Sequence, residues 1–99
     1  MATLPLPVAI DHPAYAGHFP GHPILPGVVL LDRAQRAVEQ ACGIVVSGIA
    51  MAKFLSPCLP GDDLVLDFEA SDVAVRFEIR SGERRIASGR FTVATASPV

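Results

Sequence analysis

The stretch GHFPGHPILPGVVLLD, residues 17–32, brings a histidine, a helix start and a carboxylate together in the sequence. His18 lies in a loop rich in proline and glycine, and the apolar residues after Pro26 predict a helix. Asp32 falls in the second turn of that helix, close to the free amides of its first turn. A base, a set of hydrogen-bond donors and an acid are therefore expected to lie close together. This combination is typical of an acid–base active site.

The residues on either side of this stretch predict an edge strand and a helix. Residues 3–10 can form a first strand, and Pro5 and Pro7 favour an edge position because proline lacks the N–H that a sheet requires. The helix should cover residues 27–42 and end at Gly43. Its apolar side is expected to consist of Leu30, Ala34, Ala37, Val38 and Ala41.

The second half of the chain predicts antiparallel strands. They are expected at residues 44–55, 64–69, 73–80 and 86–95, with turns at 58–62 and 81–83. The chain is therefore expected to adopt an α+β fold, as a single domain over residues 1–99. In this fold an antiparallel sheet of about five strands wraps one long central helix.

The composition favours an assembly of more than one chain. The protein has 99 residues, of which 51% are hydrophobic, and its mean hydropathy is +0.43. A domain this small buries only about 60–70% of the surface of its unfolded chain. The high apolar content therefore indicates a second buried surface, as in a homodimer or a higher oligomer.

Charge and hydropathy exclude several classes of partner. The net charge of -2 and the small number of aromatic residues argue against nucleic-acid binding. No apolar run reaches the roughly 18–20 residues of a membrane span. No signal peptide is recognisable, and Cys42 and Cys58 lack metal-ligand spacing. We therefore expect a cytoplasmic protein with two reduced thiols.

The three histidines are not expected to bind a metal. His18 and His22 have the i, i+4 spacing of helical zinc ligands, but Pro20 and Gly21 between them exclude a regular helix. His12 and His22 are therefore expected to be structural.

Two motifs resemble those of one enzyme family. Residues 17–32 resemble the signature of the bacterial 3-hydroxyacyl-[acyl carrier protein] dehydratases, which have the hotdog fold. Lys53-Phe54, Pro57 and residues 60–64 are similar to the family's K-F-x-x-P-x-x-P-G-D-x-L segment. The resemblance covers residues 8–95 and is closest to short, stand-alone members that carry Asp at the acid position.

This resemblance implies dehydration of a 3-hydroxyacyl thioester to the trans-2-enoyl thioester, without a metal or a redox cofactor. The thioester would be carried by acyl carrier protein or by CoA. In the family, the histidine removes the C2 proton and the acid helps the 3-hydroxyl to leave, and the two come from opposite subunits of a dimer with one continuous sheet. The matching positions are His18 and Asp32, and a backbone amide at Gly27 would polarise the thioester carbonyl. The substrate is expected to contact Phe19, Pro26, Val28 and Phe54.

Each of these residues also has a structural interpretation. His18 could bond only to the backbone of its loop, and Gly27 could be a simple helix start. Asp32 and Arg36 have the i, i+4 spacing of an ordinary exposed ion pair, worth only about 0.2–0.5 kcal/mol. Phe54 could belong either to the core or to an acyl pocket.

The chain departs from the family pattern around the acid. Arg33 stands where a small residue is usual, and Arg36 stands where the family has a glutamine, with Gln35 one place early. These arginines favour one alternative function, a non-catalytic subunit that binds an acyl carrier. A second alternative is a hotdog acyl-thioesterase, in which Asp32 would activate water. Four arginines could meet the phosphate or an acidic helix of a carrier protein, or could be solvated surface charge: Arg33, Arg36, Arg84 and Arg85.

Overall fold

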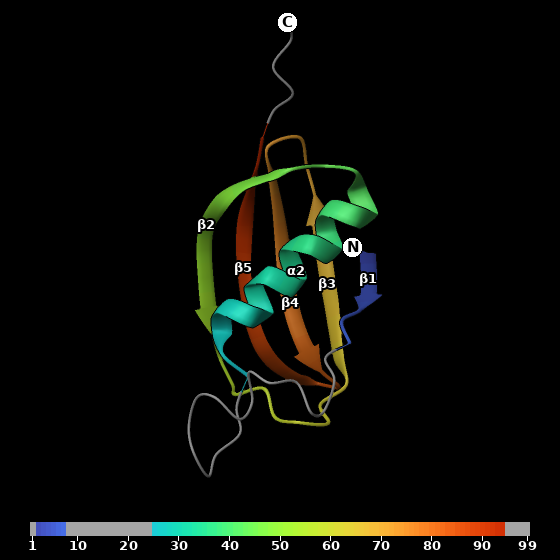
Figure 1. Ribbon diagram of the computed structural model, residues 1–99, viewed down its shortest axis with the longest axis vertical. Helices are drawn as coiled ribbons and strands as arrows, with labels where there is room; N and C mark the ends of the chain where they lie inside the picture. The colour runs from blue at the N-terminus through green and yellow to red at the C-terminus, as the bar shows by residue number, and fades with distance from the viewer. Residues whose placement is uncertain (1, 8–24, 95–99) are drawn as a thin grey trace, which may run out of the picture.

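The computed structural model describes residues 2–7 and 25–94, in which one helix lies on one face of a five-stranded antiparallel sheet (Figure 1). The elements are β1 (Ala2–Pro5), α2 (Gly27–Cys42), β2 (Val46–Phe54), β3 (Leu64–Ala70), β4 (Ala74–Ser81) and β5 (Arg84–Val93). The strand order is β1-β3-β4-β5-β2, so β1 and β2 form the two edges. The expected α+β architecture is confirmed for this part of the chain.

Helix α2 begins and ends where the sequence predicts. Its N-cap is Pro26, which has an extended backbone and offers no side-chain cap. Gly43 follows the last turn with a φ of 65°, and its N–H donates to the Glu39 carbonyl at 2.9 Å. This left-handed conformation favours glycine and ends the helix.

The buried side of α2 is shorter than predicted. Leu30, Ala34 and Val38 are buried against the sheet, and Ala37 packs at their border. The prediction for Ala41 was wrong, because this side chain is exposed. The helix crosses the sheet diagonally (Figure 1), and in its final turn Cys42, rather than Ala41, packs against the core.

The centre of the core lies between β3, β4 and β5. Leu66 pairs with Ile79 across β3 and β4, and both side chains are fully buried. The rings of Phe77 and Phe91 stack with their centroids 4.4 Å apart, which joins β4 to β5. The buried set of the alternation predicted from Val73 begins only at Val75, because Val73 precedes β4 and is 64% exposed.

A register shift near the end of the β4–β5 pair changes which residues face the helix. It falls between Ile79 and Arg80, and opposite it Ile86 and Ala87 are both buried although they are consecutive. An extra residue of this kind is a β-bulge, which re-phases the strand. As a result Arg84 lies on the core-facing side of the sheet. It pairs with Ser81, which is on the same face of β4 as the buried Ile79.

The two edges of the sheet differ. Strand β1 has four residues, ends in Pro5 and lies at an edge, as predicted, whereas residues 8–10 of the expected strand lie outside the described residues. Strand β2 has nine residues and no proline. Its residues Ile49 and Phe54 pair with the buried residues of β5, yet they are 49% and 55% exposed. The helix therefore covers the core-facing side of β2 only in part, because Val46 is buried whereas Ile49 and Phe54 are not.

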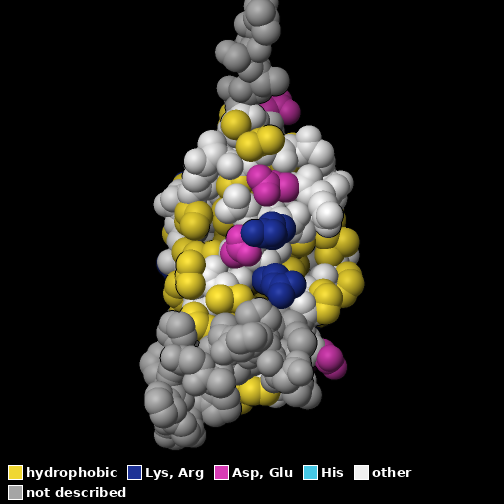
Figure 2. Space-filling view, in the orientation of Figure 1, with side chains coloured by type: hydrophobic (Ala, Val, Ile, Leu, Met, Phe, Trp, Pro, Cys, Tyr) yellow, Lys and Arg dark blue, Asp and Glu magenta, His cyan; other side chains and the backbone are white. Residues whose placement is uncertain are grey.

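The face of the molecule that carries the helix separates charge from apolar surface. Figure 2 shows Lys, Arg, Asp and Glu side chains gathered along the middle of this face, over α2, with hydrophobic side chains on both flanks. On the β2 flank the exposed apolar residues include Ile49 and Phe54, and the exposed Val28 of α2 lines the same pocket as Phe54.

The carboxylate of Asp67 attaches the short edge strand to the sheet. Asp67 accepts hydrogen bonds from Arg80 Nε at 2.7 Å and from Thr3 Oγ1 at 2.8 Å. Arg80 lies on β4 and Thr3 on β1, so one carboxylate on β3 connects three strands. The hydrogen bond from Arg80 is the largest of the effects that hold the pKa of Asp67 below its usual value, and the bond from Thr3 adds to it. Together they outweigh the partial burial of the carboxyl, which acts in the opposite direction.

We therefore predict that Asp67→Asn lowers stability in a pH-dependent way. A carboxyl with a lowered folded-state pKa contributes stability above its unfolded value of about 3.9, and this contribution is lost as the pH falls through the folded value. At pH 7 the substitution should cost about 1.5–3 kcal/mol, the usual range for a hydrogen bond to a charged group. Urea unfolding between about pH 7 and pH 2 should show the wild type and the variant converging at low pH. The exposed Asp63→Asn is the control, and an equal difference at both pH values would contradict the prediction.

Candidate active site

The start of α2 and the loop after β2 enclose a pocket of about 550 Å³, hereafter the Gly27 pocket. Pro26, Gly27 and Val28 form its helix side, and Phe54 lines it from the end of β2. The loop contributes Leu55, Ser56, Pro57 and Cys58. Four of the residues singled out in the sequence are thus brought together here: Pro26, Gly27, Val28 and Phe54.

Gly27 is in close contact with an aromatic ring. A Cβ atom at this position would overlap the ring of Phe54. A side chain here would therefore displace the ring, so glycine is favoured at this position for a steric reason. Because half of the Phe54 side chain is exposed, the ring belongs to the pocket wall rather than to the core.

The helix start presents free donors to this pocket. The amides of Val29 and Leu30 both donate to the Pro26 carbonyl, at 3.0 and 3.3 Å. Among the described residues, the amides of Gly27 and Val28 have no acceptor, and no side chain caps the helix. Free amides and the positive end of the helix dipole together suit an oxygen that gains negative charge.

Asp32 lies one helical turn beyond the pocket. It lines a second hollow of about 580 Å³ with Val28, Val29, Arg33 and Arg36, so Val28 borders both spaces. Asp32 does not line the Gly27 pocket of its own chain.

The ion pair anticipated for Asp32 is present. Arg36 Nε lies 3.2 Å from Asp32 Oδ1 and 3.1 Å from Oδ2, and the Asp32 side chain is 54% exposed. An exposed pair of this kind contributes little to stability.

The other two residues predicted for the site, His18 and Phe19, lie outside the described residues, as do His12 and His22. The described chain resumes at Leu25, whose N–H donates to the Cys58 carbonyl at 3.0 Å. Leu25 follows His18 and His22 in the sequence, and it is therefore attached to the loop that lines the Gly27 pocket.

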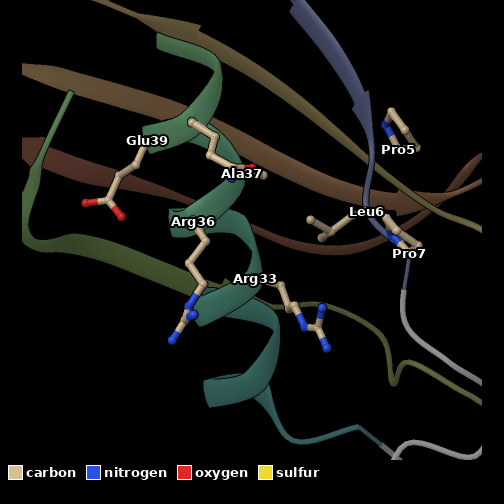
Figure 3. A pocket seen from close by; sticks show the side chains of 8 residues that line it. Pro5, Leu6, Pro7, Arg33, Arg36, Ala37 and Glu39 are labelled. Atoms are coloured by element: carbon tan, nitrogen blue, oxygen red, sulfur yellow. The ribbon is translucent and has the colours of Figure 1, made fainter. Parts of the chain in front are cut away.

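The arginines occupy different environments. Arg33 and Arg36 line a groove of about 620 Å³ between α2 and the end of β1, in which Leu6 and the flanking prolines form the opposite side (Figure 3). Arg85 Nε pairs with Glu78 Oε1 at 2.7 Å. Arg33 forms no ion pair within the part of the chain that the structure describes.

Arg84 has a contact that the sequence analysis did not anticipate. Its guanidinium binds Asp62 in the loop between β2 and β3, with 2.5 Å between Nη2 and Oδ2. Burial pulls the pKa of Asp62 upward, but hydrogen bonds from the Leu59 amide and Arg84, with the charge of Arg84, outweigh it and leave the pKa below its usual value. The only sequence signal was the place of Asp62 in the second motif.

No helix in the described ranges is long and apolar enough to cross a membrane.

Comparisons with known proteins agree with the resemblance. Residues 1–90 match the ApeI-like family, described as ApeI dehydratase. The chain is 36% identical to the 3-hydroxyacyl-[acyl-carrier-protein] dehydratase FabZ of Thermus thermophilus, over 91% of this chain and 75% of that protein. It is 39% identical to the protein of the same name from Chlamydia trachomatis serovar L2, over 70% of this chain and 52% of that protein.

A solved structure is also similar. The dehydratase heterocomplex ApeI:P from Xenorhabdus doucetiae contains a chain that matches with a TM-score of 0.81 and 26% identity, covering 93% of this chain and 85% of that one. The predicted hotdog fold is thereby confirmed.

We predict that Gly27→Ala destabilises the protein through the ring of Phe54. The added methyl group forces the ring aside, and because the ring is half exposed the cost should be about 1 kcal/mol, the low end for overpacking. Phe54→Ala should remove this cost, so the two substitutions should be strongly non-additive in denaturant unfolding. Gly48→Ala is the control, because its Cβ meets only Thr92 Oγ1, at 3.3 Å. Additive effects of Gly27→Ala and Phe54→Ala would contradict the assigned contact.

Proposed function

Because the chain belongs to the ApeI-like dehydratase family, we propose that it dehydrates a 3-hydroxyacyl thioester to the trans-2-enoyl thioester. The observation that carries this proposal is the pair of free amides at Gly27 and Val28, which open into a pocket lined largely by apolar residues. A thioester carbonyl needs such donors when its C2 proton is removed, because negative charge then develops on the oxygen.

The proposed reaction proceeds by loss of water. His18 removes the proton from C2, the C2–H electron pair forms the C2–C3 double bond, and the C3–O bond breaks. The amide of Gly27 holds the carbonyl oxygen while it carries negative charge. The substrate loses water without net oxidation or reduction, so the reaction requires no redox cofactor.

Asp32 is proposed to donate the proton to the leaving hydroxyl, directly or through a water, in the site of a partner subunit. Its position supports this assignment, because the carboxylate lies outside the Gly27 pocket of its own chain and borders an open hollow. A second subunit seated on this face would bring its own pocket to Asp32.

The proposed assembly is a homodimer formed along β2. This strand is the longer edge, and its core-facing residues Ile49 and Phe54 are half exposed. An open edge with apolar residues pairs readily with a second strand, whereas β1 is short and ends in proline. Two copies joined at β2 would each cover the uncovered side of the other.

We further propose a carrier-bound substrate and a cytoplasmic location. The FabZ relatives are named for acyl-carrier-protein substrates, and the cation of Arg33 lies beside Asp32 in the same hollow. Such a cation suits the acidic surface or the phosphate of a carrier. No disulfide joins Cys42 and Cys58, the two cysteines of the chain, as expected in a reducing compartment.

The activity is tested in the hydration direction with trans-2-enoyl thioesters of CoA and of acyl carrier protein. The wild type should remove the absorbance of the conjugated enoyl thioester, and His18→Ala and Asp32→Asn should each lower kcat by about 10²–10⁴-fold. Asp63→Asn, at an exposed position outside the site, is the matched control for the carboxylate change. Unchanged activity in His18→Ala would exclude the mechanism, and release of free thiol instead of hydration would indicate a thioesterase.

The assembly is tested by a charge at the exposed edge. Ile49→Asp should convert the dimer to a monomer in light scattering, because a carboxylate cannot be buried unpaired in an apolar interface. Val73→Asp, which changes another exposed apolar residue, between β3 and β4, should remain dimeric. A wild-type chain that is monomeric alone and pairs only with a second, related chain would indicate an assembly of the kind named for ApeI:P.

A further inference from the structure

The loop between β2 and β3 forms one wall of the Gly27 pocket. Four consecutive residues, Leu55 to Cys58, line the pocket opposite the helix start. A loop wall keeps its shape only if something fixes it, because loops have few backbone bonds of their own. The contacts of this loop therefore decide how well the pocket is defined.

Arg84 binds this loop at three points. Its Nη1 donates to Ser56 Oγ at 2.8 Å and to the Pro57 carbonyl at 2.7 Å, and its Nη2 donates to Asp62 Oδ2 at 2.5 Å. A planar guanidinium with several donors in fixed directions suits this arrangement, whereas the single ammonium of a lysine does not. We call this set of four residues the Arg84 clamp.

Asp62 extends the clamp to the end of the loop. The same carboxylate accepts the Leu59 amide at 2.8 Å and lies 3.4 Å from Ser81 Oγ. Arg84 and Ser81 flank the turn between β4 and β5, so both ends of the loop are attached to that turn. The β4–β5 pair belongs to the centre of the sheet, which makes it a rigid support.

The clamp also reaches the helix start through the backbone. Cys58 follows Pro57, the clamped residue, and its carbonyl accepts the Leu25 amide at 3.0 Å. Leu25 is 2% exposed and stands two residues before Gly27, which carries the free amide. A shift of the loop would therefore move the pocket wall and the approach to the helix start together.

We propose that Arg84 is a positioning residue that fixes the wall of the Gly27 pocket and the start of α2, and so sets which acyl chains the pocket accepts. This inference rests on the proposed function, because it assigns an acyl chain to the pocket. On this proposal the guanidinium of Arg84 binds the loop between β2 and β3, and it does not serve as a contact for an acyl carrier.

The adjacent arginine supplies a matched control. Arg85 pairs with Glu78, and neither side chain lines the Gly27 pocket. Arg84→Gln and Arg85→Gln thus each remove one cation and one ion pair from neighbouring positions of β5. Arg84→Lys keeps the charge but not the three-point geometry.

The first experiment compares the hydration of trans-2-enoyl-CoA substrates of increasing chain length. Arg84→Gln should change the ratio of kcat/KM between long and short chains by about tenfold, because an altered pocket wall changes the fit of each methylene. Arg84→Lys should recover part of the wild-type profile, and Arg85→Gln should keep it. If Arg84→Gln and Arg85→Gln have the same ratio of kcat/KM between long and short chains, the inference is overturned. This holds even if both variants are slower than the wild type.

The second experiment does not depend on activity. Hydrogen exchange should accelerate at the amides of Leu25 and Leu59 in Arg84→Gln, and remain as in the wild type in Arg85→Gln. Unchanged exchange of the Leu66 and Ile79 amides would show that the sheet stays folded. Asp62→Asn, which removes only the charge of the other partner, should give the same local acceleration if Arg84→Gln is too unstable to study.

The two experiments separate the clamp from the proposed function. A wild type that hydrates no enoyl thioester would refute the proposed function, and the exchange data would still decide whether Arg84 fixes the loop. An active wild type with no local change of exchange in Arg84→Gln would refute the clamp alone.

Discussion

The structure depends on the difference in width between its helix and its sheet. A helix with its side chains is about 10 Å wide, whereas five strands spaced by about 4.8 Å span about 20 Å. One helix can therefore cover only part of the sheet face. In this protein α2 covers the centre, where Leu66, Ile79 and Phe91 are fully buried, and leaves Ile49 and Phe54 of β2 half exposed. The exposed Phe54 and the pocket beside Gly27 both result from this mismatch.

The elements whose signals are local could be predicted from the sequence. The helix bounds followed from Pro26 and from Gly43, each of which acts on its own backbone. The alternation in β3 was equally clear, because one face of that strand is buried and the other is not. Local periodicity could not show that Ala41 leaves the core, since this depends on the diagonal path of the helix across the sheet.

The sequence suggested residues for the candidate site but not the contacts that support its walls. The sequence brought Gly27 and Phe54 into one hypothesis from two separate motifs, and the structure places the ring of Phe54 against Gly27. It could not reveal the contact of Arg84 with Asp62, because these residues are 22 positions apart and meet only through the β4–β5 turn. The sequence around Arg84 does not distinguish a solvated arginine from one that binds a loop.

The unequal edges of the sheet limit how far it can grow. A sheet with two open edges can add strands on both sides without end, and this is how fibres form. Here one edge is a nine-residue strand and the other is a four-residue strand that ends in Pro5. Once two such sheets join at their long edges, both free ends of the joined sheet are the short, proline-bearing ones. Strand-by-strand polymerisation then terminates by itself, so a chain with more than half of its residues hydrophobic can present an open edge without becoming a fibre.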